Sequence, residues 1–276
     1  MNMKRVFALL LAALLLCGCT NAATPETEPI PTEATVAETQ APTEPSTEAA
    51  AEVPTEPETT ESETQPEDPE WLHSGIREDG SFDEGTLFIG DSLTYGMVAS
   101  YLPEHQHLGD ARYITMPGAT ILAYFVGPVL RNSSDYFCYY SPEFEGLQFH
   151  EAVGVAGEDT TAIYFMMGTN YSKYATDADY IQIVEHMLES CPNATVYIQL
   201  VPYDRSPKID YETANQRVWN AYEHFQEAGE ERVMLIDTQT AIDYNLGGDG
   251  IHLTVQGQEN WYNAIVAFAE ENNIPQ

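Results

Sequence analysis

The stretch LFIGDSLTYGM, Leu87 to Met97, joins an apolar run to Gly-Asp-Ser and then to residues that suit a helix. An apolar run of this length that ends at Gly90 is typical of a strand buried on both faces, as in parallel sheets. A serine at the junction of strand and helix has two interpretations, because Ser92 could cap the helix or serve as a nucleophile. Residues far downstream decide between them.

Outward from this stretch, short apolar runs alternate with longer amphipathic segments. Strands are predicted over residues 86–90, 111–116, 161–167, 194–201 and 232–237. Helices are predicted over residues 177–191, 210–229 and 257–273, where apolar side chains recur at helical spacing. The alternation predicts an α/β domain with a parallel sheet that is covered by helices on both faces.

The N-terminus carries an export signal. Lys4 and Arg5 precede an apolar run over residues 6–16, which is too short to span a bilayer and suits a cleaved signal peptide over residues 1–18. The letters LCGC that follow resemble the lipobox of bacterial lipoproteins, so Cys19 is the expected lipidation site. An ordinary signal peptide that happens to end in Cys is the alternative. We therefore expect an extracytoplasmic protein that is anchored by lipid to a bacterial membrane.

Composition separates a linker from a folded domain. Residues 19–70 are rich in Thr, Glu, Pro and Ala and lack Lys, Arg and aromatic residues, so we expect a disordered acidic linker followed by a domain over residues 71–276. From Trp71 onward there are 30 acidic residues against 8 Lys and Arg, within a chain of formal net charge −34. This charge disfavours binding to nucleic acids and to anionic lipid surfaces.

Polar residues follow three of the predicted strands. Ser92 follows the first strand, Asn170 follows the third, and Asp249 and His252 follow the fifth. The carboxyl ends of parallel strands share one edge of the sheet, so these residues should meet there. Serine catalysis requires a nucleophile, a base, a carboxylate that orients the base and a donor to the oxyanion; Ser92, His252, Asp249 and Asn170 can fill these roles.

Asp249 and His252 could instead bind a metal ion. A metal site needs further ligands, and the sequence contains neither a CxxC pair nor an HExxH motif. No metal and no organic cofactor is therefore expected.

Three motifs together resemble the SGNH, or GDSL, hydrolases, a family of esterases, lipases and carbohydrate deacetylases. GDSLTYG, GTN and DGIHLTVQG match blocks of that family in order, and the resemblance extends over about residues 86–268. It implies the SGNH hydrolase fold, a flavodoxin-like three-layer α/β/α arrangement with a five-stranded parallel sheet. It also implies a Ser92, His252 and Asp249 triad, with oxyanion donors at the Ser92 N–H, at Gly118 and at Asn170. One departure is Tyr171, where the family usually has Asp.

The implied activity is that of a serine ester hydrolase that cleaves acetyl or short-chain esters through an acyl-enzyme, with carbohydrate esters among its expected substrates. The base must be neutral, so activity should fall as the pH drops through about 6 to 7. A cell-wall glycan O-acetyltransferase with the same triad and a non-catalytic surface binding lipoprotein remain alternatives. The expected partners are an ester substrate and, through the lipid anchor only, the membrane; the protein is expected to be a monomer.

Two segments are candidates for the walls of a substrate site. The first is the aromatic segment over residues 124–150, in which packing of a long loop is the alternative to substrate contact, and the second is the loop over residues 201–208. Cys138 and Cys191 could form one disulfide outside the cell, and their spacing alone leaves this open. The aromatic candidates in the first segment are Tyr136, Phe137, Tyr139 and Tyr140.

Overall fold

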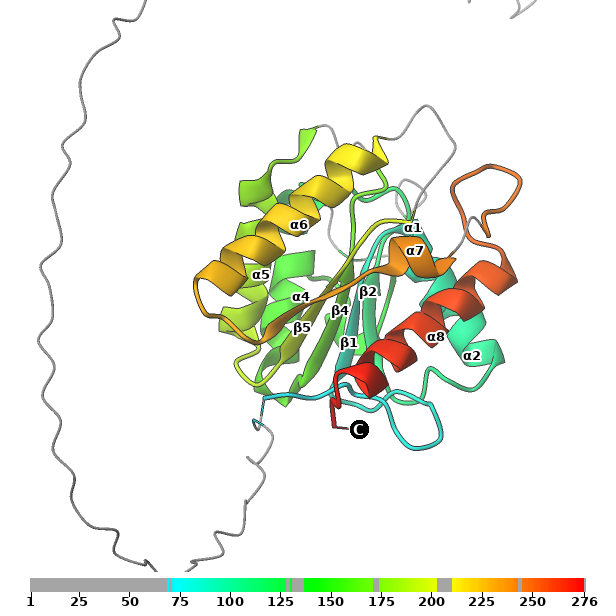
Figure 1. Cartoon of the computed structure of the whole chain (residues 1–276), viewed down its shortest axis with the longest axis horizontal. Coiled ribbons are helices and arrows are strands. Elements are labelled where there is room, and N and C mark those ends of the chain that lie inside the picture. The colour runs from blue at the N-terminus through cyan, green and yellow to red at the C-terminus, as the bar shows by residue number, and fades with distance from the viewer. Residues whose placement is uncertain are drawn as a thin grey trace, which may run out of the picture. The chain divides into compact units, whose positions relative to one another are not determined.

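A six-stranded sheet lies at the centre of the fold (Figure 1). The strand order is β3-β2-β1-β4-β5-β6; all neighbours are parallel except β3, which runs antiparallel to β2. Without β3 the order is 2-1-3-4-5, so the predicted flavodoxin-like class is confirmed. The predicted count of five strands is wrong by one, the two-residue β3. The strands are β1 (Thr86–Gly90), β2 (Arg112–Thr115), β3 (Tyr139–Tyr140), β4 (Ala162–Met166), β5 (Thr195–Gln199) and β6 (Val233–Ile236).

The structure, a computed structural model, describes Pro69 and residues 71–127, 130, 137–170, 174–202, 210–242 and 245–275. Several sequence predictions lie outside these residues, among them the signal peptide, the Cys19 lipidation site and nearly all of the linker. Tyr136, Tyr171 and residues 203–208 of the second wall candidate also lie outside them. Within the described part of the chain, none of the helices combines the length and apolar character that crossing a bilayer requires.

Helices cover both faces of the sheet (Figure 1). Leu87 and Ile89 of β1 pack into the apolar cluster on the side of α4, α5 and α6, whereas Phe88 packs into the cluster on the side of α1 and α8. This alternation explains the unbroken apolar run of β1. The α-helices are α1 (Ser92–Gly96), α2 (Leu102–Glu104), α3 (Ala123–Val126), α4 (Phe149–Ala156), α5 (Asp177–Ser190), α6 (Tyr211–Glu227), α7 (Thr238–Ile242) and α8 (Val255–Glu271). Shorter turns are the π-helix η1 (Met97–Tyr101) and the 3₁₀-helices η2 (Pro142–Phe144) and η3 (Gly157–Asp159).

The junction between β1 and α1 depends on Gly90. A Cβ atom at this position would collide with the Thr94 side chain and the carbonyl of Met166. Glycine therefore lets the first turn of α1 lie directly against the ends of β1 and β4. This close approach positions the segment that begins at Asp91.

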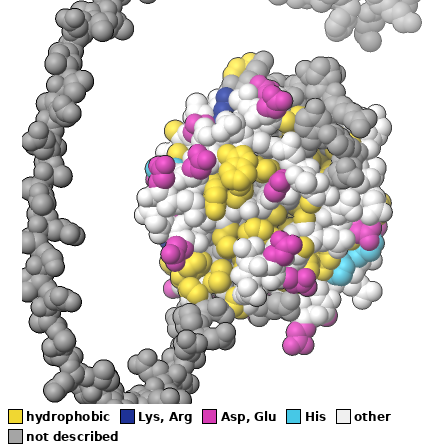
Figure 2. All heavy atoms as spheres, in the orientation of Figure 1, with side chains coloured by type: hydrophobic (Ala, Val, Ile, Leu, Met, Phe, Trp, Pro, Cys, Tyr) yellow, Lys and Arg dark blue, Asp and Glu magenta, His cyan; other side chains and the backbone are white. Residues whose placement is uncertain are grey.

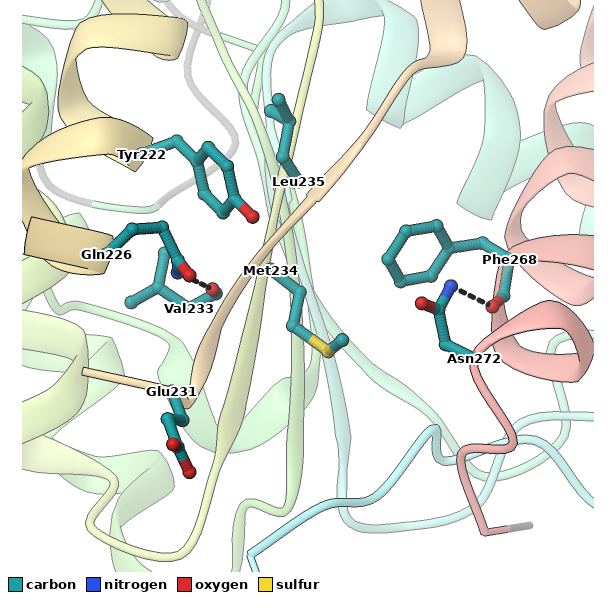
Figure 3. Close-up of a pocket in the computed structure, with 8 residues that line it drawn as sticks. All are labelled: Tyr222, Gln226, Glu231, Val233, Met234, Leu235, Phe268 and Asn272. Atoms are coloured by element: carbon teal, nitrogen blue, oxygen red, sulfur yellow. Dashed lines mark hydrogen bonds between the residues drawn. The ribbon is translucent and has the colours of Figure 1, made fainter. Parts of the chain in front are cut away.

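The face over β6 is apolar at its centre, with acidic side chains around it (Figure 2). A pocket of about 200 Å³ lies here, where β6 runs between α6 and α8 (Figure 3). Gln226 of α6 donates a hydrogen bond to the Val233 carbonyl of β6 at 3.0 Å. Among the residues that line this pocket, Glu231 and Tyr222 are the ionisable ones. The lining therefore does not combine a nucleophile with a base. The pocket is lined by Tyr222, Gln226, Glu231, Val233, Met234, Leu235, Phe268 and Asn272.

Candidate active site

Ser92 is the first residue of α1, and Asp91 is its N-cap. The Asp91 carboxylate accepts a hydrogen bond from the Leu93 N–H at 3.1 Å. The interpretation of Ser92 as the cap of this helix is therefore wrong. Ser92 is partly exposed, and its hydroxyl forms no hydrogen bond with another described residue.

Asp249 and His252 lie on the loop between α7 and α8 and contact each other. Asp249 Oδ2 lies 2.6 Å from His252 Nδ1, and Asp249 Oδ1 accepts hydrogen bonds from the N–H groups of Ile251 and His252, both at 3.0 Å. The hydrogen bond with His252, followed by the two backbone N–H groups, lowers the pKa of Asp249 to about 2. The carboxylate fixes Nδ1, which leaves Nε2 as the ring nitrogen for proton transfer.

Helix α8 brings this loop toward α1. Thr254 caps α8 by accepting a hydrogen bond from the Gly257 N–H at 3.1 Å, two residues after His252. A Cβ atom on Gly96, at the end of α1, would lie 2.8 Å from Gln258 Nε2 in the first turns of α8. No hydrogen bond joins Ser92 to His252 among the described residues. Such contacts often form fully only in the substrate complex.

A chain of hydrogen bonds joins the ends of β1, β4 and β2. Asp91 Oδ2 accepts hydrogen bonds from the N–H of Thr169, at 3.3 Å, and from its hydroxyl. Thr169 Oγ1 accepts a hydrogen bond from Asn170 Nδ2 at 3.2 Å, and the same amide nitrogen donates to the Ala119 carbonyl at 3.0 Å. The residues that follow three neighbouring strands are therefore held together by side chains.

Asp91 is fully buried in this chain. Burial raises the pKa of its carboxyl, while the hydrogen bonds from Thr169 and Leu93 lower it and offset part of that effect. A raised carboxyl pKa means that this group favours the folded state most at low pH. Its contribution is lost as the pH rises through the pKa of the folded state.

The turn after β2 carries Gly118. Gly118 has φ +81°, follows Pro117, and is enclosed by a hydrogen bond from the Ala119 N–H to the Met116 carbonyl at 2.9 Å, as in a type II turn. The Gly118 N–H forms no hydrogen bond within the described residues, and neither does the Ser92 N–H. Both backbone groups are available to a developing negative charge.

Asn170 lies beside the turn that contains Gly118, and its amide nitrogen already donates to two acceptors. Nδ2 has two hydrogens, and it faces two acceptors, Ala119 O and Thr169 Oγ1. The Ala119 carbonyl can only accept, so the nitrogen and not Oδ1 must face it. Direct donation by Asn170 to an oxyanion stays a prediction, since it requires one of these two hydrogen bonds to break.

The aromatic candidates take different positions. Phe137 is 54% exposed, Tyr139 stacks on Tyr113, and Tyr140 packs against the cluster on the side of α4, α5 and α6. Sequence reasoning missed Tyr95, which contacts both Phe137 and Tyr139. Its position three residues after Ser92 was the available signal, because residues at that spacing share a helix face.

Other predictions concern sulfur and metal. Cys138 and Cys191 are buried and are not joined in a disulfide. Cys191 Sγ instead lies 3.7 Å from the Val153 carbonyl. Within the described ranges, no three His, Cys, Asp or Glu side chains are grouped so that they could hold a metal ion.

The fold can be set beside solved structures. An active-site mutant of a family two carbohydrate esterase from Clostridium thermocellum matches with a TM-score of 0.48 and 13% identity, over 68% of this chain and 63% of that chain. This chain thus spans less than two thirds of that esterase. A carbohydrate esterase family 3 protein from Talaromyces cellulolyticus matches with a TM-score of 0.45 and 15% identity, over 68% of this chain and 96% of that chain. A lipase/acylhydrolase from Enterococcus faecalis matches with a TM-score of 0.45 and 16% identity, over 68% of this chain and 96% of that chain.

No protein-family model matches the sequence, and no curated protein sequence matches it either. In the arrangement of its sheet and helices, the chain is similar to carbohydrate esterases and GDSL-like lipases.

Proposed function

We propose that this protein is a serine ester hydrolase with Ser92 as nucleophile, His252 as base and Asp249 as the carboxylate that orients the base. The contact of 2.6 Å between Asp249 and His252 carries the proposal, together with the close approach of Gln258 of α8 to Gly96 of α1. A carboxylate–imidazole pair that reaches a serine hydroxyl is the arrangement that activates a weak nucleophile.

The reaction proceeds in two halves. His252 Nε2 takes the proton of the Ser92 hydroxyl while Ser92 Oγ attacks the ester carbonyl, and the imidazolium then gives this proton to the departing alcohol. In the second half, His252 takes a proton from water, and the resulting hydroxide attacks the acyl-enzyme. The acid leaves, and the proton returns to Ser92 Oγ. The side chains of this chain suffice for both halves, with no cofactor.

The oxyanion is stabilised by backbone donors. The N–H groups of Ser92 and Gly118 belong to segments that the Asp91–Thr169–Asn170–Ala119 chain holds together. Asn170 supports this site by fixing the Gly118 turn, and it donates directly only when substrate replaces one of its present acceptors.

The substrate we propose is an acetyl or short-chain ester, on carbohydrates among other alcohols, outside the cell. The export signal and the LCGC letters support a lipid-anchored extracytoplasmic location. The acidic composition, with its formal net charge of −34, supports neutral substrates over anionic lipids. The same charge supports a protein that acts as a monomer and does not bind nucleic acid.

A panel of esters tests this proposal. Purified full-length protein should hydrolyse acetyl esters, with rates that fall as the acyl chain grows, and a fluorophosphonate probe should label Ser92. Product analysis in the presence of a glycan acceptor separates hydrolysis from transfer, since an acetyltransferase would acetylate the glycan in preference to water. A protein that neither hydrolyses any ester nor reacts with the probe would be a binding protein, and the proposal would be wrong.

The pH profile is expected to show a single acidic limb. The lowered pKa of Asp249, about 2, keeps this carboxylate charged at every pH above its usual value of 3.8. Its contact with His252 is therefore present above that value and is lost only as the pH falls through about 2. Between about pH 4 and 9, titration of Asp249 should therefore contribute nothing to a loss of rate on acidification. A plot of log kcat/KM against pH should have a limiting slope of one, and a slope of two would show that a second carboxyl must be ionised.

Asn170→Ala is expected to lower kcat by about a hundredfold, because the Gly118 turn loses its hydrogen bond from Nδ2 and the oxyanion loses a donor. Steady-state kinetics with an acetyl ester measures the effect. Thr169→Val tests only the hydrogen bonds that hold Asn170 in place. It removes the hydroxyl that accepts a hydrogen bond from the Asn170 amide and donates one to Asp91. A smaller loss of kcat is expected for Thr169→Val, and an Asn170→Ala enzyme with unchanged kcat would remove Asn170 from the site.

A further inference from the structure

Aromatic rings form a continuous group beside Ser92. Tyr95 follows Ser92 by three residues in α1, so the two side chains lie on the same side of this helix. Tyr95 meets Phe137 at a centroid distance of 5.4 Å and an angle of 88°, and Tyr139 at 5.6 Å and 84°. Tyr139 stacks on Tyr113 of β2 at 4.7 Å and 8°. We call Tyr95, Tyr113, Phe137 and Tyr139 the aromatic wall.

The outer part of the aromatic wall is open to solvent. Phe137 is 54% exposed and Tyr95 is partly exposed, whereas Tyr113 and Tyr139 pack against the apolar cluster on the side of α1 and α8. Burial raises the pKa of Tyr113, so this phenol is uncharged at neutral pH. The Tyr95 hydroxyl forms no hydrogen bond within the described residues. The wall therefore offers uncharged ring surfaces with one available hydroxyl.

The aromatic wall connects α1 with β2 and β3. Tyr113 lies in β2, the strand that leads into the turn with Gly118, and Tyr139 pairs with Thr115 at the end of that strand. The wall is thus built from α1, which begins at Ser92, and from the end of the strand that leads into the Gly118 turn. An ester whose carbonyl reaches both Ser92 and the Gly118 N–H would bring its alcohol part close to these two segments.

Alkyl chains and sugar rings both bind to aromatic surfaces, and the solvent exposure of the aromatic wall favours a sugar ring. An alkyl chain gains most when protein surrounds it, because its stabilisation grows with the apolar area removed from water. A pyranose ring needs only one covered face, since its C–H face packs on an aromatic ring while its hydroxyl groups stay hydrated or bond to a neighbour such as the Tyr95 hydroxyl. The 30 acidic residues against 8 Lys and Arg from Trp71 onward oppose a negatively charged sugar.

We infer that the aromatic wall is a binding subsite for a neutral pyranose ring, which is the alcohol part of the ester that Ser92 attacks. The inference rests on the proposed esterase function, and it adds the substrate class and the residues that select it. Tyr95 and Phe137 are the residues that contact the sugar, while Tyr139 and Tyr113 support them from behind.

The test compares two acetyl esters in the full-length enzyme. One is a mono-O-acetylated methyl glucopyranoside, and the other is ethyl acetate, whose alcohol is too small to cover the wall. Phe137→Ala and Tyr95→Ala should each lower the ratio of kcat/KM for the sugar ester to that for ethyl acetate by about tenfold, mainly through KM. Trp219→Ala is the matched control, because Trp219 is an aromatic residue on α6 that is 40% exposed and lies outside the wall. This control should leave the ratio unchanged.

Three results would overturn the inference. The ratio could stay constant in both wall variants, or both esters could lose rate equally, which would indicate a structural role. The variants could instead lose rate selectively on ethyl esters of longer acyl chains, which would assign the wall to the acyl group. If wild-type protein hydrolyses no ester, the proposed function fails. Saturation-transfer NMR with methyl glucopyranoside then still decides whether wild type binds the sugar more strongly than Phe137→Ala does.

Discussion

Replacing Ser92 with alanine is expected to lower kcat/KM for an acetyl ester by about a thousandfold or more. The change removes the attacking oxygen and leaves the surrounding structure in place, since Asp91 and not Ser92 caps α1 and the Ser92 hydroxyl bonds to no described residue. The unfolding midpoint should therefore stay close to that of wild type. Steady-state hydrolysis and labelling by a fluorophosphonate probe both measure the loss.

Ser100→Ala provides the control for this experiment. Ser100 is an exposed serine in η1, eight residues further along the chain, and its hydroxyl contacts Glu104 at 3.4 Å. This variant should keep its activity to within about twofold, because exposed substitutions away from such sites have small effects. A Ser92→Ala enzyme that hydrolyses the ester as fast as wild type would refute the assignment of the nucleophile.

Asp249→Asn is expected to lower kcat by about a thousandfold to ten-thousandfold. The asparagine oxygen can still accept the two backbone hydrogen bonds from Ile251 and His252, so the loop should keep its conformation. The amide that replaces Oδ2 cannot, however, stabilise an imidazolium or hold Nδ1 as the protonated nitrogen. Activity should fall while the free energy of unfolding changes little, and kinetics together with thermal unfolding measure the two effects separately.

Asp110→Asn is the matched control for Asp249→Asn. Asp110 is an exposed carboxylate that contacts Arg77 at 2.6 Å, away from the loop between α7 and α8. Its replacement should cost little activity, since exposed ion pairs contribute little. An Asp249→Asn enzyme that keeps more than about a tenth of the wild-type kcat would show that another group orients His252.

The central strands β1, β4 and β5 were predictable because every one of their residues is buried, and β2 and β6 are buried in part. Residues 86–90 were predicted as a strand and form β1, and the other four long strands fall within their predicted ranges. β3 was missed because two residues, Tyr139 and Tyr140, cannot display a strand pattern. α4 was also missed, although Gln148 and Glu151 form a capping box at its start, which was the local signal that could have revealed it.

The candidate site also has one part that the sequence predicts and another part that only the fold reveals. Ser92, Asp249 and His252 stand in recognisable motifs, and the close spacing of Asp249 and His252 is enough to indicate that the two side chains meet. The bond from Thr169 to Asp91 joins residues 78 positions apart, and the bond from Asn170 to Ala119 joins residues 51 apart. No pattern in one sequence reports such pairs, because they depend on which strands are neighbours in the sheet. The strand order β2-β1-β4 brings these residues together.

The hydrogen bond between Gln226 and the Val233 carbonyl has a further consequence, for self-association. An open edge strand presents unpaired backbone groups to which a strand of another molecule can add, and this is a common route to aggregation. At β6, a foreign strand could reach the Val233 carbonyl only by displacing the Gln226 amide, and Glu231 would bring a charge to the new contact. Gln226 thus protects a sheet edge whose apolar surroundings would otherwise favour stacking of copies. Gln226→Ala should show this as faster aggregation at high protein concentration.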